Sequence, residues 1–331
     1  MSSSGSLKDL GKVVAIGGGT GLPILLEALK PIKGEPNFEK ISAIVTVSDT
    51  GGSSGRLRRD LGTLAPGDIR NCLVALSNAP ELLRDLFRYR FSQGELQGHS
   101  FGNLFIVALA EVMGDFSKAI EKLHDILAIQ GQIFPSTKEN VELVAKFADG
   151  TSVKGEELIT QKRGKIVKIN LTPADCSPPQ GAIKVLQEAD LILIGPGSLF
   201  TSVIPNILVR KIQSTIIKSK ARKVYLCNLV TQKGETDNFS ASDHIKEIFK
   251  ISSKGLIDTI LVNSNKISKE TLSRYVEQGS TQVKLDENEL FSLNLTVIKK
   301  DLVLEDELIR HDPKKLRKAI IEIMKKQMEK P

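Results

Sequence analysis

The stretch VVAIGGGTGLPILLEALK, residues 13–30, decides the fold class. Its first four residues are apolar and partly β-branched, which predicts a short buried strand. Apolar residues at helical spacing follow from Leu22 onward and predict a helix. Between the two stand Gly17, Gly18, Gly19, Thr20 and Gly21. A glycine-rich turn from a strand into a helix lets an anion approach the backbone N–H groups and the helix N-terminus, so we expect a phosphate-binding loop here.

Strand-like and helical patterns continue to alternate along the chain. Further apolar runs are ISAIVTV (41–47), DLILIG (190–195), KVYLCNL (223–229) and DTILVN (258–263). Continuous apolar strands that alternate with helices are typical of a parallel sheet covered on both faces. The fold class is therefore α/β, with a mainly parallel sheet.

Three segments differ from this pattern. Residues 132–172 alternate around Asp149-Gly150 and end in IVKINL, which predicts a small β insertion. Residues 1–11 read as a disordered leader, which leaves 12–312 as the main domain. Residues 313–331 predict a basic C-terminal helix, whose lysines we interpret as a solvated face. Contact of that face with nucleic acid or a membrane is the alternative.

Composition excludes several classes of protein. The 331 residues contain no apolar run of the roughly 20 residues that a membrane span needs, and the start has no signal-peptide core. Three distant cysteines and four histidines without ligand spacing argue against a disulfide framework or a structural zinc site. We expect a cytoplasmic protein with free thiols, without a membrane span and not bound to nucleic acid.

Three more loops follow predicted strands. The second contains Asp49, Gly51, Gly52, Ser53 and Ser54; the third contains Gly195, Gly197 and Ser198; the fourth contains Asn228 and Thr231. Each alone is ordinary turn chemistry, but ligands of α/β sheets bind at the carboxyl ends of strands. Asp49 is a candidate metal ligand for a divalent ion that bridges phosphates, and its alternative is a turn or cap aspartate.

Other nucleotide-binding patterns fit less well. No Gly-Lys-Ser/Thr ending is present, and Leu22 stands where a dinucleotide-binding loop has its third glycine. Asp49 ends the second strand, which keeps NAD as a rival ligand. Ser53, Ser54 and His99 lack the GxSxG context of a hydrolase. Asn103, in GHSFGN, is compatible with a helix cap or a substrate contact.

The quoted segments resemble a known family. GGGTGLPILLEALK, TVSDTGGSSGRLRRDLGTLAPGDIRNCLVALS, GHSFGNL, GPGSLFTSVIPN and CNLVTQKGETD are similar to the YvcK branch of the CofD-like family, the gluconeogenesis factors. The resemblance implies a Rossmann-like three-layer sandwich and binding of UDP-sugars such as UDP-N-acetylglucosamine. It implies ligand contacts from the loop at 17–21, Asn228, Tyr275 and Arg310, and the quoted motifs add Asp68, Asn71 and Asn103. Thr50 stands where these relatives usually carry a second aspartate.

The resemblance leads to two functional hypotheses. The first is a UDP-sugar-binding regulatory protein linked to carbon metabolism, cell shape and cell-wall synthesis, without turnover and with no required cofactor. The alternative is a magnesium-dependent transferase of phosphorus-containing groups, like 2-phospho-L-lactate transferase. Phosphoryl chemistry is mostly positioning, so a binder and a transferase can share the same loops. Mg²⁺, a regulatory partner protein and a homo-oligomer all stay open.

Overall fold

The computed structural model describes residues 10–277, 279–306 and 308–328. Residues 1–9 of the expected leader, and residues 329–331 of the expected C-terminal helix, lie outside them. Leu10 is buried, and its N–H donates to Asn37 O at 2.8 Å, so the ordered chain has begun by residue 10. No helix in these ranges is long and apolar enough to cross a membrane.

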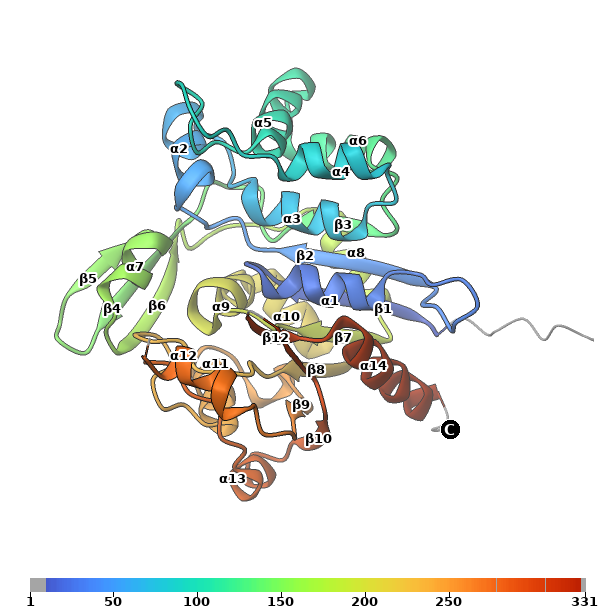
Figure 1. The fold of residues 1–331 in the computed structure, drawn as a ribbon, viewed down its shortest axis with the longest axis vertical. Helices are drawn as coiled ribbons and strands as arrows, with labels where there is room; N and C mark the ends of the chain where they lie inside the picture. Colours follow the sequence, from blue (N-terminus) through green and yellow to red (C-terminus); the bar gives the residue numbers. More distant parts are fainter. Residues whose placement is uncertain (1–9, 278, 307, 329–331) are drawn as a thin grey trace, which may run out of the picture.

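A seven-stranded sheet forms the centre of the molecule (Figure 1). Its order is β10-β9-β8-β7-β1-β2-β3, and every neighbouring pair is parallel, as predicted. The strands are β1 (Lys12–Gly17), β2 (Lys40–Val45), β3 (Gln132–Pro135), β7 (Leu191–Ile194), β8 (Arg222–Leu226), β9 (Thr259–Asn263) and β10 (Thr296–Lys300). The chain proceeds outward from β1 in both directions, so the topological switch point lies between β1 and β7.

Helices cover both faces of the sheet, and alternate residues of β1 point into the two cores. Val13 and Ala15 pack in one hydrophobic cluster, and Val14 and Ile16 in the other. Helices of the first cluster are α1 (Gly21–Leu29), α3 (Gly67–Leu76), α4 (Glu81–Arg88), α5 (Phe101–Met113), α6 (Phe116–Ile126) and α14 (Pro313–Met328). Helices of the second are α8 (Gln180–Glu188), α9 (Ile204–Leu208), α10 (Arg210–Lys218), α11 (Ala241–Ile251) and α13 (Glu287–Ser292). This arrangement confirms the α/β sandwich.

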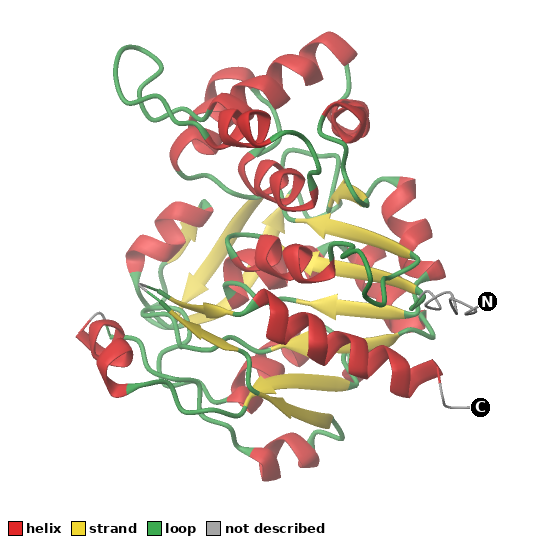
Figure 2. Ribbon diagram, turned by 45° about the vertical axis from the view of Figure 1, so that its right-hand side comes forward, coloured by secondary structure: helices red, strands yellow, loops and turns green. Residues whose placement is uncertain are grey.

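The β insertion is shorter than predicted. Its sheet has the order β5-β4-β6, with antiparallel pairing, and α7 packs on it. The elements are β4 (Glu142–Phe147), β5 (Ser152–Lys154), α7 (Glu156–Lys162) and β6 (Ile166–Thr172). Residues 132–135, by contrast, form β3 and pair with β2 in the main sheet, because the apolar Ile133 fills the core beneath α6. Figure 2 shows the central strands running toward the side where the insertion lies.

A second correction concerns the loop expected at 48–56. From Gly52 onward this stretch is helical, as α2 (Gly52–Leu61). Gly55 is required inside that helix, since a Cβ there would lie 1.8 Å from Thr50 O. The remaining elements are η1 (Leu199–Val203), η2 (Lys254–Leu256), α12 (Lys269–Glu277) and the hairpin of β11 (Val303–Glu305) and β12 (Ile309–His311).

Candidate ligand-binding site

The loops after β1, β7 and β8 meet at the switch point and enclose a crevice of about 190 Å³. We call it the switch-point crevice. Because these three strands are adjacent and parallel, their carboxyl ends open at one edge of the sheet, where α/β proteins bind ligands. Hairpin β11–β12 adds the remaining wall. The lining residues are Thr20, Gly21, Ile24, Pro196, Gly197, Ser198, Asn228, Leu229, Val230, Gln232, Ile309, Arg310 and His311.

Close packing of the first loop against the segments that follow β7 and β2 explains two of its glycines. A Cβ on Gly21 would lie 2.3 Å from Pro196 O, and one on Gly18 would lie 2.5 Å from Thr46 Cγ2. Gly19 has a φ of +61°, which L side chains rarely adopt. The glycines therefore bring three strand ends together as closely as backbone allows, with the N-terminus of α1 opening beside the crevice.

The N–H of Gly19 already holds an anionic group. It donates to Asp68 Oδ2 at 2.7 Å, from the first turn of α3. Burial raises the pKa of Asp68 to about 6, against the opposing effect of this hydrogen bond. The glycine loop therefore presents a backbone donor to a carboxylate, as an anion-binding loop would.

Asp68 belongs to a group of carboxylates that we call the acidic cluster: Asp49, Asp68, Glu156 and Glu235. Burial, together with the charges of the other three, raises the pKa of Glu156 to about 7. Burial also raises the pKa of Glu235, which is 7% exposed and accepts a hydrogen bond from Ser198 Oγ. Ser198 thereby joins the crevice to the acidic cluster.

The acidic cluster has the right chemistry for a hard cation but not a complete site. Carboxylate oxygens are the ligands that Mg²⁺ prefers. Within the described ranges, however, no three His, Cys, Asp or Glu side chains are grouped so that they could hold a metal ion. Asp49, the predicted metal ligand, accepts the N–H of Gly51 at 2.8 Å, which is the turn-aspartate alternative. A cation here would need oxygen atoms from a bound ligand as well.

Thr50, the residue expected to weaken a metal site, has a structural contact. Its Oγ1 accepts the N–H of Glu157 at 3.1 Å, in the first turn of α7. This hydroxyl therefore satisfies a free helix N-terminal donor, as a cap residue does, but from another segment of the chain. The contact ties the insertion to the loop after β2 and holds the neighbouring Glu156 beside the other carboxylates of the acidic cluster.

Two predicted ligand residues come from the C-terminal part of the chain. Arg310 lines the crevice and its Nη2 lies 3.2 Å from Asp306 Oδ2, in a half-exposed ion pair. Tyr275, on α12, does not line the crevice. Its Oη accepts the N–H of Ile309 at 2.8 Å, next to Arg310. Tyr275 is therefore placed to orient the strand that carries Arg310, whereas the sequence suggested contact with the ligand.

Comparison with known proteins fits this architecture. The model of the family described as 2-phospho-L-lactate transferase CofD matches residues 13–303, nearly the whole described chain. The chain belongs to the CofD family. It is 49% identical over 320 residues to the "Putative gluconeogenesis factor" of Aquifex aeolicus, covering 96% of this chain and 97% of that one. It is 43% identical over 318 residues to the gluconeogenesis factor of Bacillus subtilis, covering 95% and 98%. These matches confirm the resemblance to the gluconeogenesis factors.

A solved CofD-family structure is also similar to this chain. A crystal structure of a protein from Bacillus halodurans superimposes with a TM-score of 0.90 at 43% identity, over 95% of this chain and all of that one. This likeness confirms the Rossmann-like fold that the sequence motifs implied.

Several other predicted site residues of this CofD-family chain form hydrogen bonds within the protein. Ser53 Oγ lies 3.2 Å from His99 Nδ1, and Ser54 Oγ accepts the N–H of Gly67 at 3.2 Å. Both serines are 3% exposed. Because the second glycine stretch is helical, its serines point into the protein and brace α3 and the segment before α5. Gly51 and Gly52 start α2.

Some of the remaining predicted residues also form hydrogen bonds within the protein. Asn228 is fixed on Gly197, accepting its N–H at 3.1 Å and donating to its C=O at 2.8 Å, so it shapes the third loop. Thr231 is 2% exposed and bonds to Thr281. Asn71 accepts a hydrogen bond from Arg70, and Asn103 is 2% exposed, its Oδ1 without a partner among the described residues. Gly195 has a φ of +81°.

Sequence reasoning did not identify Glu156 or His311. Glu156 lies in the insertion, and His311 lies on β12 within a segment without a recognisable motif. Burial lowers the pKa of His311 to about 4, so this crevice residue is neutral at physiological pH. Neither residue carried a local signal, because each reaches the site only through tertiary packing. Glu235 stood in the quoted GETD segment but was not singled out.

Proposed function

We propose that this CofD-family chain is a UDP-sugar-binding regulatory protein of the gluconeogenesis-factor type, with a ligand like UDP-N-acetylglucosamine. One observation supports it above the others: the crevice joins a glycine-rich helix N-terminus to an arginine from a distant hairpin. Such a helix N-terminus attracts phosphate, and an arginine binds phosphate oxygens through two parallel N–H groups. The name gluconeogenesis factor, which the relatives carry, supports a linked role in carbon metabolism. We extend the proposal to cell shape and cell-wall synthesis, which the family resemblance of the sequence motifs implies.

The crevice is suited to the diphosphate end of such a ligand. Its 190 Å³ is smaller than the 300–1,000 Å³ usual for a complete small-molecule site. We therefore expect the diphosphate to lie between Gly21 and Arg310, while the base and sugar extend along the edge of the sheet. Asn228 and Pro196 hold the wall opposite α1 in place, so the ligand meets a preformed surface.

The main test is isothermal titration calorimetry with UDP-N-acetylglucosamine, with UDP and NAD as comparison ligands. We expect UDP-N-acetylglucosamine to bind and NAD not to bind. Arg310→Ala should weaken binding at least tenfold, which corresponds to about 1.4 kcal/mol, since a charge-assisted hydrogen bond is lost. Arg88→Ala is the matched control, because it removes an equally exposed i,i+3 ion pair with Asp85 far from the crevice. Equal loss in both variants, or tighter binding of NAD, would contradict the proposal.

The acidic cluster favours a second candidate, the magnesium-dependent transferase. Its carboxylates would share a cation with the phosphates of the ligand, and they adjoin the loops that bind those phosphates. Titration with and without Mg²⁺ separates the two functions. A regulatory binder should keep its affinity within about twofold and should not turn over the phospho-lactate substrates of the transferase. Magnesium-dependent transfer that Asp49→Asn abolishes would favour the enzyme.

A further inference from the structure

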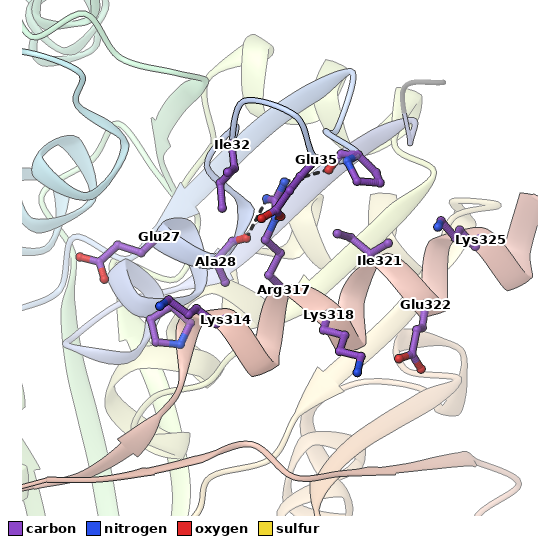
Figure 3. Close-up of a pocket in the computed structure, with 12 residues that line it drawn as sticks. Glu27, Ala28, Ile32, Glu35, Lys314, Arg317, Lys318, Ile321, Glu322 and Lys325 are labelled. Carbon is purple, nitrogen blue, oxygen red and sulfur yellow. Dashed lines mark hydrogen bonds and ion pairs between the residues drawn. The ribbon is translucent and has the colours of Figure 1, made fainter. Parts of the chain in front are cut away.

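A groove larger than the crevice lies at the other end of α1 (Figure 3). It has a volume of about 600 Å³ and runs between α14, the end of α1 and the segment 31–37. We call it the α1–α14 groove. Its apolar floor comes from Ala28, Ile32, Pro36, Pro313 and Ile321. The phosphate loops and the acidic cluster contribute nothing to it, so the proposed function leaves it unexplained.

Arg317 makes the groove a preformed feature. The side chain is 4% exposed, and its Nε donates to Glu35 Oε2 at 2.8 Å. Its two Nη atoms donate to Ala28 O at 3.2 Å and to Pro36 O at 2.8 Å. One guanidinium therefore fastens α14 to both α1 and the segment 31–37. Because its donors are satisfied within the chain, Arg317 builds the groove and is not free to bind a ligand.

The charged residues along the groove are unevenly paired. Lys314, Lys318 and Lys325 line its α14 side and are exposed. None of them forms an ion pair within the described residues, whereas Lys315 of the same helix pairs with Asp301. Three carboxylates also line the groove: Glu27 on α1, Glu35 in the segment 31–37 and Glu322 on α14. Among the described residues Glu35 and Glu322 pair with Arg317 and Lys300, which leaves Glu27 as the one lining carboxylate without an ion pair. The groove is therefore electropositive.

The three lysines and one residue of the apolar floor, Ile321, lie in one row along α14. Lys314, Lys318, Ile321 and Lys325 are spaced by four, three and four residues, so they lie along one side of α14. The row is about 16 Å long at a rise of 1.5 Å per residue, which is the length of three helical turns. Charges spread over that length do not converge on one phosphate. The apolar side chains line a recess, which suits another protein segment better than a flat lipid surface.

We propose that the α1–α14 groove docks an acidic amphipathic helix of a partner protein. Such a helix would place its apolar side chains on Ile32 and Ile321 and its carboxylates beside the three lysines. This is the helix-in-groove mode of recognition, in which anchors at i, i+3 or i+4, and i+7 give the affinity. The lysines set the preference for acidic partners and speed the encounter.

The groove and the crevice share two elements. Helix α1 starts in the crevice with Gly21 and Ile24 and ends in the groove with Glu27 and Ala28. The chain passes from Arg310 in the crevice to Lys314 in the groove within four residues. A docked partner would therefore touch both elements that hold the proposed ligand, although docking itself does not depend on the identity of that ligand.

The test is selection of 18-residue peptides from a random display library on the full chain, followed by fluorescence anisotropy with the enriched peptides. We expect enriched sequences to carry an apolar row at helical spacing flanked by Asp or Glu. Lys318→Glu and Ile321→Ser should each weaken their binding at least tenfold. Lys326→Glu is the matched control, since Lys326 is exposed on α14 but does not line the groove. It makes the same charge change and should alter binding less than twofold.

Three outcomes would overturn the proposal. In the first, no peptide is enriched, or the enriched peptides lack the acidic pattern. In the second, Lys326→Glu weakens peptide binding as much as Lys318→Glu does. In the third, the Lys318→Glu variant binds the peptides normally and UDP-N-acetylglucosamine displaces them. Titration of UDP-N-acetylglucosamine on the same variants keeps this result separate from the proposed function, because Lys318 is outside the crevice.

Discussion

Gly19 combines a backbone requirement with a proposed binding role. Its φ of +61° excludes most side chains, and its N–H faces an anionic partner. Gly34 has a φ of +83° and open space around its Cα, in the segment that follows α1. The two glycines therefore share the conformational constraint, and only Gly19 stands in the proposed phosphate loop.

We predict that Gly19→Val abolishes binding of UDP-N-acetylglucosamine, whereas Gly34→Val leaves it intact. Both variants should lose roughly 1–3 kcal/mol of unfolding free energy, because valine is strained in the left-handed region. Calorimetry measures the binding, and circular dichroism during urea unfolding measures the stability. Normal binding by Gly19→Val would mean that the first loop is not the phosphate site.

The raised pKa of Asp68 predicts a pH dependence of the unfolding free energy. Its pKa is about 6 in the folded chain against 3.8 for an ordinary aspartate, so the folded state binds a proton more tightly than the unfolded state does. Stability therefore falls as pH rises from about 4 to 6, and the loss persists above that range. Asp68→Asn should remove this loss and raise the unfolding free energy at pH 7.5 by up to about 3 kcal/mol, with little effect at pH 4. Urea unfolding at both pH values measures the difference.

The asparagine keeps an oxygen for the Gly19 N–H, so the hydrogen bond itself is preserved in this variant. A less stable Asp68→Asn protein at pH 7.5 would show that the ionised carboxylate is compensated by the loop. At the residue scale, the sequence predicted Asp68 and the glycines because they stand in contiguous motifs. It missed Glu156, because a carboxylate in an insertion gains meaning only when folding brings it beside Asp49.

Elements were predictable where a pattern is long and local. The strand β1, the helices α1 and α14, and the hairpin around Asp149-Gly150 are all present as expected. The strand β3 was placed in the wrong sheet, because four residues do not encode which partner they pair with. The start of α2 was interpreted as a loop, since two glycines and two serines have low helix propensity, which packing on α5 overrides.

At the scale of elements, the contact of Thr50 leads to a prediction about the local stability of α7. Thr50→Val keeps the shape of the side chain but removes the acceptor for the Glu157 N–H, so α7 should lose about 1 kcal/mol of local stability. Hydrogen exchange should become faster in residues 156–162. Thr50→Ser and Thr50→Asp both keep an acceptor and serve as controls with unchanged exchange. Equal protection of α7 in the valine variant would mean that the cap contributes nothing.

At the scale of the whole molecule, the two proposed sites should influence each other. If the peptide and UDP-N-acetylglucosamine both bind through α1 and the β12–α14 segment, each should change the affinity of the other by the same factor. We predict a factor of at least three, measured by anisotropy of the peptide with and without saturating ligand, and by calorimetry in the reverse order. Unchanged affinities in both directions would make the two sites independent.

The order of the sheet was only partly open to prediction. Alternating apolar strands and helices indicated parallel pairing, but nothing local states that β7 lies beside β1 and not beside β2. That pairing creates the switch point. The sequence therefore predicted the edge of the sheet at which the crevice lies, but it did not predict which loops together form the walls of the crevice. Arg310 was placed near it by resemblance alone.

The same strand order has a consequence for how the chain is made. The strand β1 is made before the other described strands, yet one of its edges waits for β7, and Lys12 meets Asp190 only after another 178 residues. Until then its apolar edge is open to pairing with other chains. The proposed ligand cannot protect this early stage, since Arg310 is added later still. Only the completed chain could therefore gain stability from the proposed UDP-sugar, whereas the nascent chain has to avoid mispairing without it.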